Sequence, residues 1–268
     1  MMRSNIEYED MARRLRLIML DLLRGGMSGH LGGSLSLAEI LTVLYHEGLA
    51  NAKGRLILSK GHAEIGLYAL LLHEGILAAD EITRLKKMGS VLQGHPSKGW
   101  IPWLDYSGGS LGQGLSFGMG MAIALLGRSE KVFVILGDGE LQEGQVWEAV
   151  LQAPRFRLGN LIAIVDMNGY QLSGETLCLR NPKDMEHAWQ SMGWEVFHVN
   201  GHDIASIRSK IMRVMDAGSG VPQVILASTV KGMGITEFKD GGLHCVVLTE
   251  SEIDRFTCEL KKAGCDQE

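Results

Sequence analysis

Residues 132–140 read Val-Phe-Val-Ile-Leu-Gly-Asp-Gly-Glu. An uninterrupted apolar run that ends at glycine is typical of a strand buried on both faces of a parallel sheet. Asp138 follows this strand at its carboxyl end, the edge where open α/β sheets bind ligands. Gly137 and Gly139 allow the backbone to come close to a bulky anionic group. Because Asp138 alone would repel a diphosphate, we expect a divalent cation between the two.

A second predicted strand ends in a matching ligand. Residues 161–168 read Leu-Ile-Ala-Ile-Val-Asp-Met-Asn, so Asn168 also follows an apolar run. The predicted helix at 141–158 is the crossover that neighbouring parallel strands require. Mg²⁺ prefers oxygen ligands, and the Asn168 amide can supply one beside the Asp138 carboxylate. The alternative is that Gly-Asp-Gly and Asn-Gly are merely turns, but their pairing across a crossover helix favours the metal site.

Two other phosphate-binding motifs are excluded. The pattern that begins at Gly112 continues with Phe117 where the dinucleotide fingerprint needs glycine, and no Gly-Lys-Ser/Thr motif occurs. The chain therefore lacks the sequence features of the commonest nucleotide sites.

The rest of the chain predicts an α/β fold. Apolar runs predict strands at 56–58, 132–136, 161–165 and 224–227, with a further strand at 195–199. Helical patterns cover a segment from Met11 to Gly25-Gly26, then 36–49, 60–72, 112–126 and 141–158, and another begins at Asp80. Ser36 and Glu39 have the spacing of a capping box, and 91–109 predicts a long functional loop. We expect a doubly wound, mostly parallel sheet with helices on both faces, in one domain spanning 1–268.

The composition excludes several classes of protein. The 268 residues are 46% hydrophobic and 21% charged, with a net charge of −5. These values are typical of a folded globular protein and argue against a nucleic-acid partner. No apolar run reaches the roughly 18 residues of a membrane helix. The four cysteines lack zinc spacing, so we expect a soluble cytoplasmic protein with reduced thiols; they are Cys178, Cys245, Cys258 and Cys265.

Together these motifs resemble one family. Gly137-Asp138-Gly139 followed by Asn168 is similar to the thiamine-diphosphate motif, and further segments in the same order are similar to those of transketolases. They are Ser28-Gly29-His30-Leu31-Gly32-Gly33, Ser59-Lys60-Gly61-His62, Gly94-His95-Pro96, Gly109-Ser110-Leu111-Gly112-Gln113-Gly114 and Leu141-Gln142-Glu143-Gly144. The resemblance runs from about residue 10 to residue 250 and corresponds to the N-terminal, diphosphate-binding half of full-length transketolase.

The resemblance implies a cofactor site for thiamine diphosphate and Mg²⁺. Its metal ligands would be Asp138, Asn168 and the backbone carbonyl of Tyr170. The diphosphate would contact Gly139, His62 and His244, and the cofactor rings would lie against Gly109, Ser110 and Leu111. Glu143 would lie at a subunit interface, in a carboxylate network that links paired active sites.

The resemblance also implies that His30, His95 and His244 face a sugar, and that with His62 they form the catalytic set. Imidazoles titrate near neutral pH, so they can take a proton from a substrate hydroxyl and return it. The other five histidines are predicted to be structural; they are His46, His73, His187, His198 and His202. Two departures from the family are His244-Cys245, in place of His-Gly, and the bulky run Trp100-Ile101-Pro102-Trp103 beside the expected sugar channel.

The resemblance further implies a partner. The family's glutamate for the aminopyrimidine ring and its sugar-phosphate arginines belong to domains beyond this half. We therefore expect a separate C-terminal transketolase subunit with the pyrimidine and C-terminal domains, in an α₂β₂ assembly that transfers a two-carbon ketol unit from a ketose or ketose phosphate to an aldose.

Two alternatives remain open. The first is another thiamine-diphosphate enzyme subunit, similar to a 2-oxo-acid dehydrogenase alpha chain or a deoxyxylulose-phosphate synthase. The second is a non-catalytic subunit that keeps only the cofactor fold. The histidine-containing segments favour the transketolase interpretation over both.

Overall fold

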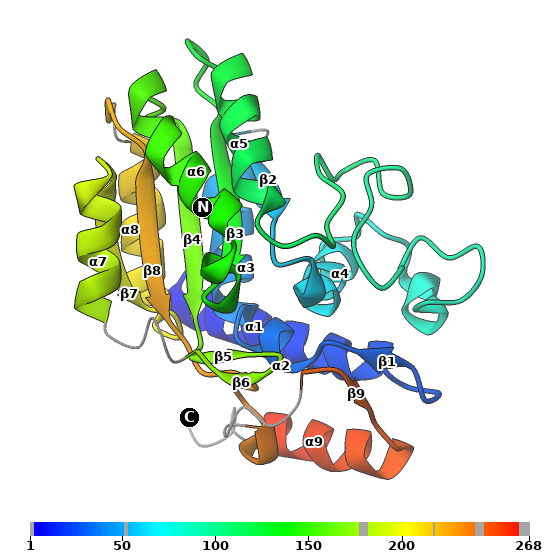
Figure 1. Ribbon diagram of the computed structural model, residues 1–268. Helices are drawn as coiled ribbons and strands as arrows, with labels where there is room; N and C mark the ends of the chain where they lie inside the picture. Colours follow the sequence, from blue (N-terminus) through cyan, green and yellow to red (C-terminus); the bar gives the residue numbers. More distant parts are fainter. Residues whose placement is uncertain (1–2, 51–52, 177–181, 217, 239–243, 263–268) are drawn as a thin grey trace.

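The computed structural model describes residues 3–50, 53–176, 182–216, 218–238 and 244–262. Its centre is a five-stranded sheet of order β2-β3-β4-β8-β7 in which every neighbouring pair is parallel (Figure 1). The strands are β2 (Gly54–Leu58), β3 (Lys131–Gly137), β4 (Leu161–Met167), β7 (Glu195–Asn200) and β8 (Gln223–Ser228). All five predicted strands are present, which confirms the predicted α/β class.

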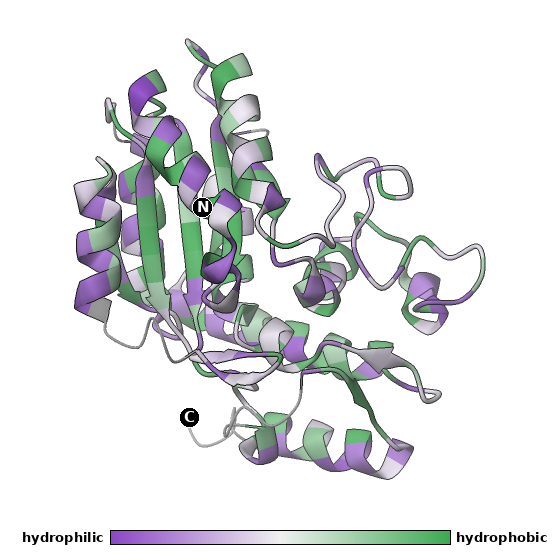
Figure 2. Ribbon diagram, in the orientation of Figure 1, coloured by the Kyte–Doolittle hydropathy of each residue, from purple (hydrophilic) through white to green (hydrophobic). Residues whose placement is uncertain are grey.

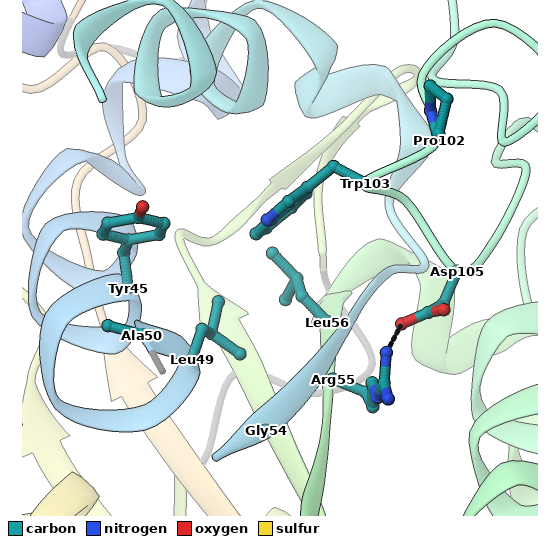
Figure 3. A pocket seen from close by; sticks show the side chains of 9 residues that line it. All are labelled: Tyr45, Leu49, Ala50, Gly54, Arg55, Leu56, Pro102, Trp103 and Asp105. Atoms are coloured by element: carbon teal, nitrogen blue, oxygen red, sulfur yellow. Dashed lines mark ion pairs between the residues drawn. The ribbon is translucent and has the colours of Figure 1, made fainter. Parts of the chain in front are cut away.

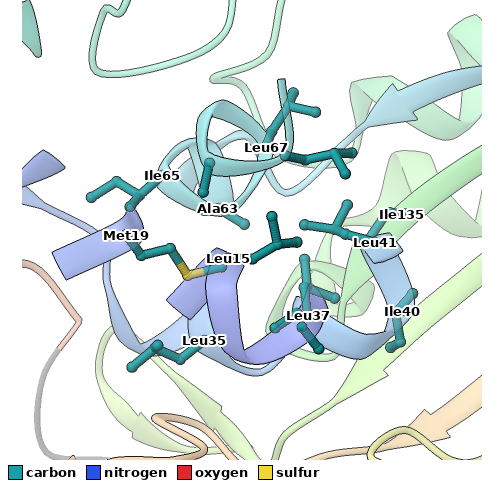
Figure 4. Packing of buried hydrophobic residues seen from close by; sticks show 14 of the residues in the cluster. Leu15, Met19, Leu35, Leu37, Ile40, Leu41, Ala63, Ile65, Leu67 and Ile135 are labelled. Atoms are coloured by element: carbon teal, nitrogen blue, oxygen red, sulfur yellow. The ribbon is translucent and has the colours of Figure 1, made fainter. Parts of the chain in front are cut away.

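Helices cover both faces of this sheet. One face carries α1 (Asn5–Leu22), α3 (Ala38–Val43), α4 (Glu64–His73) and α8 (Ile204–Asp216); the other carries α5 (Gln113–Ala124), α6 (Gly144–Gln152) and α7 (Pro182–Ser191). Successive β3 side chains point to opposite faces: Phe133 and Ile135 join the α1 core, whereas Val132 and Val134 join the α5 core. Figure 4 shows part of the first core, and Figure 2 shows that the strands are hydrophobic over much of their length. Burial on both faces explains why the inner strands β3 and β4 lack the polar alternation that the edge strand β7 shows.

The glycines of α5 bring this helix against the sheet. A Cβ on Gly114 would lie 2.4 Å from the Cβ of Ser59, and one on Gly118 would lie 2.5 Å from a methyl group of Val134. Both glycines face the sheet because they are four residues apart. Helix α5 is therefore held close to the strand ends that carry the site.

The predicted helix at 36–49 is wrong in its start and in its cap. The segment consists of α2 (Gly32–Leu35), α3 and a π-helical stretch (Leu44–Leu49). Ser36 does not cap a helix, because its Oγ donates to Asp166 Oδ2 at 2.7 Å. Glu39 pairs instead with Arg16 at 2.7 Å. Buried tertiary partners for both polar groups outweigh the local capping pattern.

Three other predicted helices are shorter than expected. Asp80 lies in a 3₁₀ stretch (Ala79–Arg84), and the predicted 60–72 helix begins as a 3₁₀ turn (Gly61–Ala63) before α4. The crossover contains α6 between two 3₁₀ turns, Gly139–Gln142 and Ala153–Phe156. Residues 91–109 contain no helix or strand, as predicted.

The last part of the chain returns to its beginning. Strand β9 (Val246–Val247) pairs antiparallel with β1 (Ser28–Gly29), and α9 (Glu250–Lys262) packs against α1 (Figure 1). This pairing brings His244 beside the Gly-rich loop that carries His30. A shorter hairpin, β5 (Tyr170–Gln171) with β6 (Gly174–Glu175), follows β4 at the same sheet edge.

Within the described ranges, no helix is long and apolar enough to cross a membrane. Cys245 and Cys258 are free and exposed. Cys178 and Cys265 lie outside the described residues.

Candidate active site and cofactor cavity

A cavity of about 370 Å³ lies at the carboxyl edge of the sheet. It brings together residues from the Gly-rich loop, the ends of β3 and β4, the β5–β6 hairpin and the segment before β9. Predicted site residues in its wall are His62, Leu111, Gly139, Glu143, Asn168, Tyr170 and His244. Segments separated by more than 180 residues of sequence therefore meet at one cavity.

Asp138 and Asn168 lie on neighbouring strand ends, as predicted. In the ladder that joins β3 to β4, Gly137 pairs with Asp166. The two oxygens of Asp138, which is 2% exposed, accept the backbone N–H groups of Gly139 at 2.8 Å and Gly169 at 2.6 Å. The amide oxygen of Asn168 accepts the N–H of Tyr170 at 3.1 Å. These hydrogen bonds hold the oxygens of Asp138 and Asn168 in place at the ends of two neighbouring strands.

The residues around Asp138 fit a hard divalent cation. Burial, followed by the nearby charge of Asp166, raises the pKa of Asp138 to about 6. Burial disfavours the ionised form of this carboxylate more than the charge of Lys60 favours it, and a bound cation would stabilise the ionised form. No group of three or more His, Cys, Asp or Glu side chains in the described part of the chain could hold a metal alone. A cation here must therefore take amide, carbonyl and phosphate oxygens as well, the ligand set typical of Mg²⁺.

The opposite wall of the cavity is cationic. Lys231 is 3% exposed and its Nζ lies 5.7 Å from the ring centre of Tyr170. Burial is the main cause that lowers the pKa of Lys231. A bound anion beside it would therefore stabilise the charged form of the ammonium group. Gly139 leaves no room for a side chain, because a Cβ there would lie 2.7 Å from the Cβ of Gln171. The wall therefore combines a buried cation with open backbone, as a diphosphate requires.

The four predicted catalytic histidines form one cluster. The ring centre of His30 lies 5.1 Å from His244, 5.9 Å from His95 and 6.0 Å from His62; the rings of His62 and His244 are also 5.1 Å apart. Burial lowers the pKa of His62 to about 2 and that of His244 to about 4, and it also lowers the pKa of His95. At neutral pH these three rings are uncharged, so each offers one acceptor nitrogen and one donor.

The remaining predicted site residues lie around the cavity. A Cβ on Gly109 would lie 3.7 Å from the ring of His95. Gly109 and Ser110 are exposed and are not among the residues that line the cavity, whereas the following residue, Leu111, is. Glu143 lines the cavity with an exposed side chain.

Trp103 lines a different pocket from the histidines. This pocket has a volume of about 330 Å³ and lies beside the first residues of β2, away from the strand ends that form the cavity (Figure 3). There Trp103 faces Tyr45, with 6.4 Å between ring centres, and Asp105 pairs with Arg55 at 3.7 Å. The bulk of Trp103 is therefore accommodated outside the cavity that contains His62 and His244.

Known proteins share this fold and these sequence segments. The family profile described as transketolase, thiamine diphosphate binding domain, matches residues 8–266. This chain belongs to the transketolase family. It is 35% identical to the 6-deoxy-6-sulfo-D-fructose transketolase subunit SqwG of Clostridium sp. (strain MSTE9), with 98% of this chain and 100% of that protein covered. It is 32% identical to an apulose-4-phosphate transketolase subunit of Phocaeicola vulgatus, with 87% and 85% covered.

Solved transketolase structures have the same fold. The transketolase of Leishmania mexicana superposes with a TM-score of 0.86 at 27% identity, over 97% of this chain and 42% of that one. The chain thus spans less than half of a full-length transketolase but the full length of the Clostridium subunit. The predicted family and its cofactor, thiamine diphosphate with a divalent metal, are confirmed.

Several polar residues of this transketolase-family site were not predicted. Lys60 Nζ contacts Asp166 Oδ2, and the same oxygen accepts from Asn168 Nδ2 at 3.0 Å. Glu140, which lines the cavity, accepts the N–H of Gly112 at 2.8 Å and so ties the start of α5 to the end of β3. Lys231 is followed by Gly232 just after β8, and a Lys-Gly pair beyond a buried strand was the available signal for it.

The raised pKa of Asp138 makes metal binding depend on pH. Because its pKa is about 6, Asp138 is protonated in the metal-free protein below that pH and must lose a proton to bind Mg²⁺. We expect affinity for Mg²⁺ with thiamine diphosphate to fall about tenfold per pH unit below 6 and to level off above 7. Calorimetry in buffers of different ionisation enthalpy would measure the released proton, with Mg²⁺ and cofactor alone as the control for the cofactor's own titration. Constant affinity from pH 5 to 7 would contradict this assignment.

Proposed function

We propose that this chain is the cofactor-binding component of a two-subunit transketolase, which transfers a two-carbon ketol unit from a ketose or ketose phosphate to an aldose. The observation that carries the proposal is the cluster of four imidazoles beside the cavity of a thiamine-diphosphate-binding domain. A chain that only bound the cofactor would have no use for such a cluster. The names of the Clostridium and Phocaeicola relatives, both transketolase subunits, support the same reaction.

In this proposal two parts of the cavity wall bind the diphosphate group of the cofactor, one through a metal ion and one directly. Asp138, the Asn168 amide oxygen and the Tyr170 carbonyl bind Mg²⁺. Lys231 and His62 bind the diphosphate, which Gly139 allows to approach the backbone. The bound cofactor supplies the electron sink for carbon–carbon bond cleavage. Metal and cation together neutralise an anion that neither wall could hold alone.

The histidines then move protons at the sugar. Cleavage requires a base for a substrate hydroxyl proton, and the reverse step returns that proton to an alkoxide. His30, His95 and His244 are grouped closely enough to contact neighbouring hydroxyl groups of one sugar. Because His95 and His244 are neutral at pH 7, each can accept a proton or donate a hydrogen bond to a developing oxyanion.

We infer that a C-terminal transketolase subunit covers the α5–α6 face, in an α₂β₂ assembly. Exposed large apolar side chains gather at these two helices and the segments at their ends; they are Leu111, Phe117, Ile123, Leu126, Leu151 and Phe156. A group of exposed apolar side chains of this size is typical of an interface, and Leu111 connects the group to the cavity. The exposed carboxylate of Glu143 adjoins this face and would contact the partner.

This interface can be tested with two variants of equal exposure. Ile123 on α5 and Met212 on α8 are both 36% exposed, but the two helices lie on opposite faces of the sheet. We expect Ile123→Glu to weaken association with the partner subunit at least tenfold, because it buries a charge in the interface. Met212→Glu should leave association unchanged. Analytical ultracentrifugation of the mixed subunits measures both; equal association of the two variants would place the interface elsewhere.

We also infer that the protein acts in the cytoplasm. Its exposed free thiols, Cys245 and Cys258, fit a reducing compartment. Fractionation of the source cells with an antibody against the chain would test this.

The proposed reaction is tested by reconstitution. The chain is mixed with a pyrimidine-domain transketolase subunit from the same organism, together with Mg²⁺ and thiamine diphosphate, and is offered ketose phosphates and pyruvate in separate assays. We expect ketose consumption with an aldose acceptor, no pyruvate turnover and no activity of either chain alone. Consumption of pyruvate would indicate a different thiamine-diphosphate enzyme, and no turnover of any ketose would contradict the proposal.

A further inference from the structure

A buried carboxylate faces the histidine cluster. Glu64 is the first residue of α4 and is 0% exposed. Its two oxygens lie 3.0 and 3.2 Å from Nδ1 of His30. A carboxylate so deeply buried is costly unless it has a charged or hydrogen-bonded partner. In the described part of the chain, the ion pair that Glu64 forms is with His30.

The surroundings of Glu64 do not provide another use for it. Tyr68 lies one helical turn further along α4, and its hydroxyl donates to the carbonyl of Gln93 at 2.9 Å. The negative charge of Glu64 also acts to raise the pKa of His95, against the larger effect of burial. The first turn of a helix is also a position where the helix dipole favours a negative charge. The hydrogen bond to His30 is therefore the contact that fixes the orientation of the Glu64 carboxylate in the described part of the chain.

We propose that Glu64 is a positioning residue for His30, which it holds with a proton on Nδ1 and the Nε2 lone pair free. The proposal rests on the transketolase activity proposed above. In the cleavage step a substrate hydroxyl proton moves to Nε2, and the imidazolium that forms is stabilised by the Glu64 carboxylate. In the reverse step Nε2 returns the proton to the alkoxide, so neither ring nor carboxylate is changed after one turnover. An aspartate that fixes a tautomer and stabilises an imidazolium acts in this way in serine proteases.

The sequence pattern does not show this role. A glutamate in the first turn of a helix is ordinary, since acidic residues are favoured there without any further function. The contact between Glu64 and His30 depends on the fold, because His30 follows β1 and lies against the start of α4.

The tautomer can be measured on the single chain, without any enzyme assay. In a chain labelled with ¹⁵N-histidine, we expect the neutral ring of His30 to show the Nδ1–H tautomer. Glu64→Ala should lose this preference, and so should Glu64→Gln, because its amide can donate an N–H to Nδ1 where the carboxylate can only accept. Glu74→Gln is a matched control at the other end of α4, where Glu74 pairs with Nε2 of His46 at 3.2 Å. It should alter the His46 signals and leave those of His30 unchanged.

Activity of the two-subunit complex tests the same pair during catalysis. Glu64→Gln should lower kcat about 100-fold with KM and cofactor affinity nearly unchanged, because His30 loses both the fixed tautomer and the counter-charge of its imidazolium. Full kcat in Glu64→Gln, or a His30 tautomer insensitive to Glu64→Ala, would overturn the proposal. If Glu64→Ala does not fold, the isosteric Glu64→Gln and the wild-type tautomer still decide it. An inactive wild-type complex would instead refute the proposed function, and the tautomer measurement would still report on the pair.

Discussion

Replacing Asp138 by alanine is expected to lower the affinity for Mg²⁺ with thiamine diphosphate about 1000-fold and to abolish ketol transfer. Removal of one partner from a buried charge pair costs about 4 kcal/mol, which corresponds to this factor. Asp138 is the charged ligand in the proposed metal site, because Asn168 and the Tyr170 carbonyl are neutral. Without it the diphosphate would retain Lys231 but lose its cation.

The same substitution should not unfold the metal-free chain. Burial raises the pKa of Asp138 to about 6, above the roughly 3.9 of an unfolded aspartate. The folded protein therefore binds the proton more tightly than the unfolded chain, and the contribution of this group to stability falls as the pH rises from about 4 to 6. At pH 7 the ionised group opposes folding until a cation binds. Asp138→Ala removes this unfavourable charge, and it also removes the hydrogen bonds from Gly139 and Gly169. The two effects on the free energy of unfolding oppose each other.

Calorimetry on the single chain measures the loss of affinity, and circular dichroism checks the fold. Asp203→Ala is a suitable control, because Asp203 accepts the N–H of Ala205 at 3.0 Å at the start of α8. That variant should lose about 1 kcal/mol of stability with the helix cap and keep full cofactor affinity. A cofactor affinity of Asp138→Ala within threefold of wild type would show that the metal is held elsewhere.

The sheet and its ligand-binding edge were predictable because both depend on short sequence segments. Residues 132–136 of β3 and 161–165 of β4 are all apolar because both faces of the sheet are covered, and such a run is recognisable without knowing what covers it. Parallel neighbours then place the residues after the strands side by side. The hydrogen bond from Gly169 N–H, the residue after Asn168, to Asp138 Oδ2 at 2.6 Å shows that the two strand ends lie side by side, as the sequence pattern predicted.

Contacts between distant segments were not predictable from local patterns. Ser36 and Glu39 have capping-box spacing, but their partners are Asp166 and Arg16, which no local signal indicates. His244 joins the cluster because β9 pairs with β1, a ladder of only two residues. Strands this short carry little hydrophobic pattern, so family resemblance was the available guide to His244.

A large loss of stability is expected when Asp166, near the end of β4, is replaced. Its carboxylate is 0% exposed and contacts Lys60, itself 1% exposed, as well as Ser36 and Thr229. Burial tends to raise the pKa of Asp166, but the charge of Lys60 lowers it below its usual value, so the group stays ionised at neutral pH. We expect Asp166→Asn to cost about 3–5 kcal/mol of unfolding free energy, because it leaves the Lys60 ammonium buried without a counter-charge.

Urea unfolding of the cofactor-free chain would measure this loss. Glu130→Gln is the control, since its pair with Arg55 at 3.0 Å is partly exposed and should contribute less than about 1 kcal/mol. If Asp166→Asn costs no more than Glu130→Gln, the buried pair is not what stabilises this region.

The double variant Lys60→Met with Asp166→Leu, which removes both charges and the acceptor for Asn168, separates stability from cofactor binding. Removing both charges should recover most of the lost stability, since no uncompensated ion remains in the interior. Cofactor affinity should stay low, because Asp166 also accepts from Asn168 Nδ2 at 3.0 Å and thereby turns the amide oxygen of Asn168 toward the metal site. Recovery of both properties would mean that Asp166 acts only through charge. Recovery of stability alone would show that the buried pair fixes the orientation of a metal ligand as well as supporting the fold.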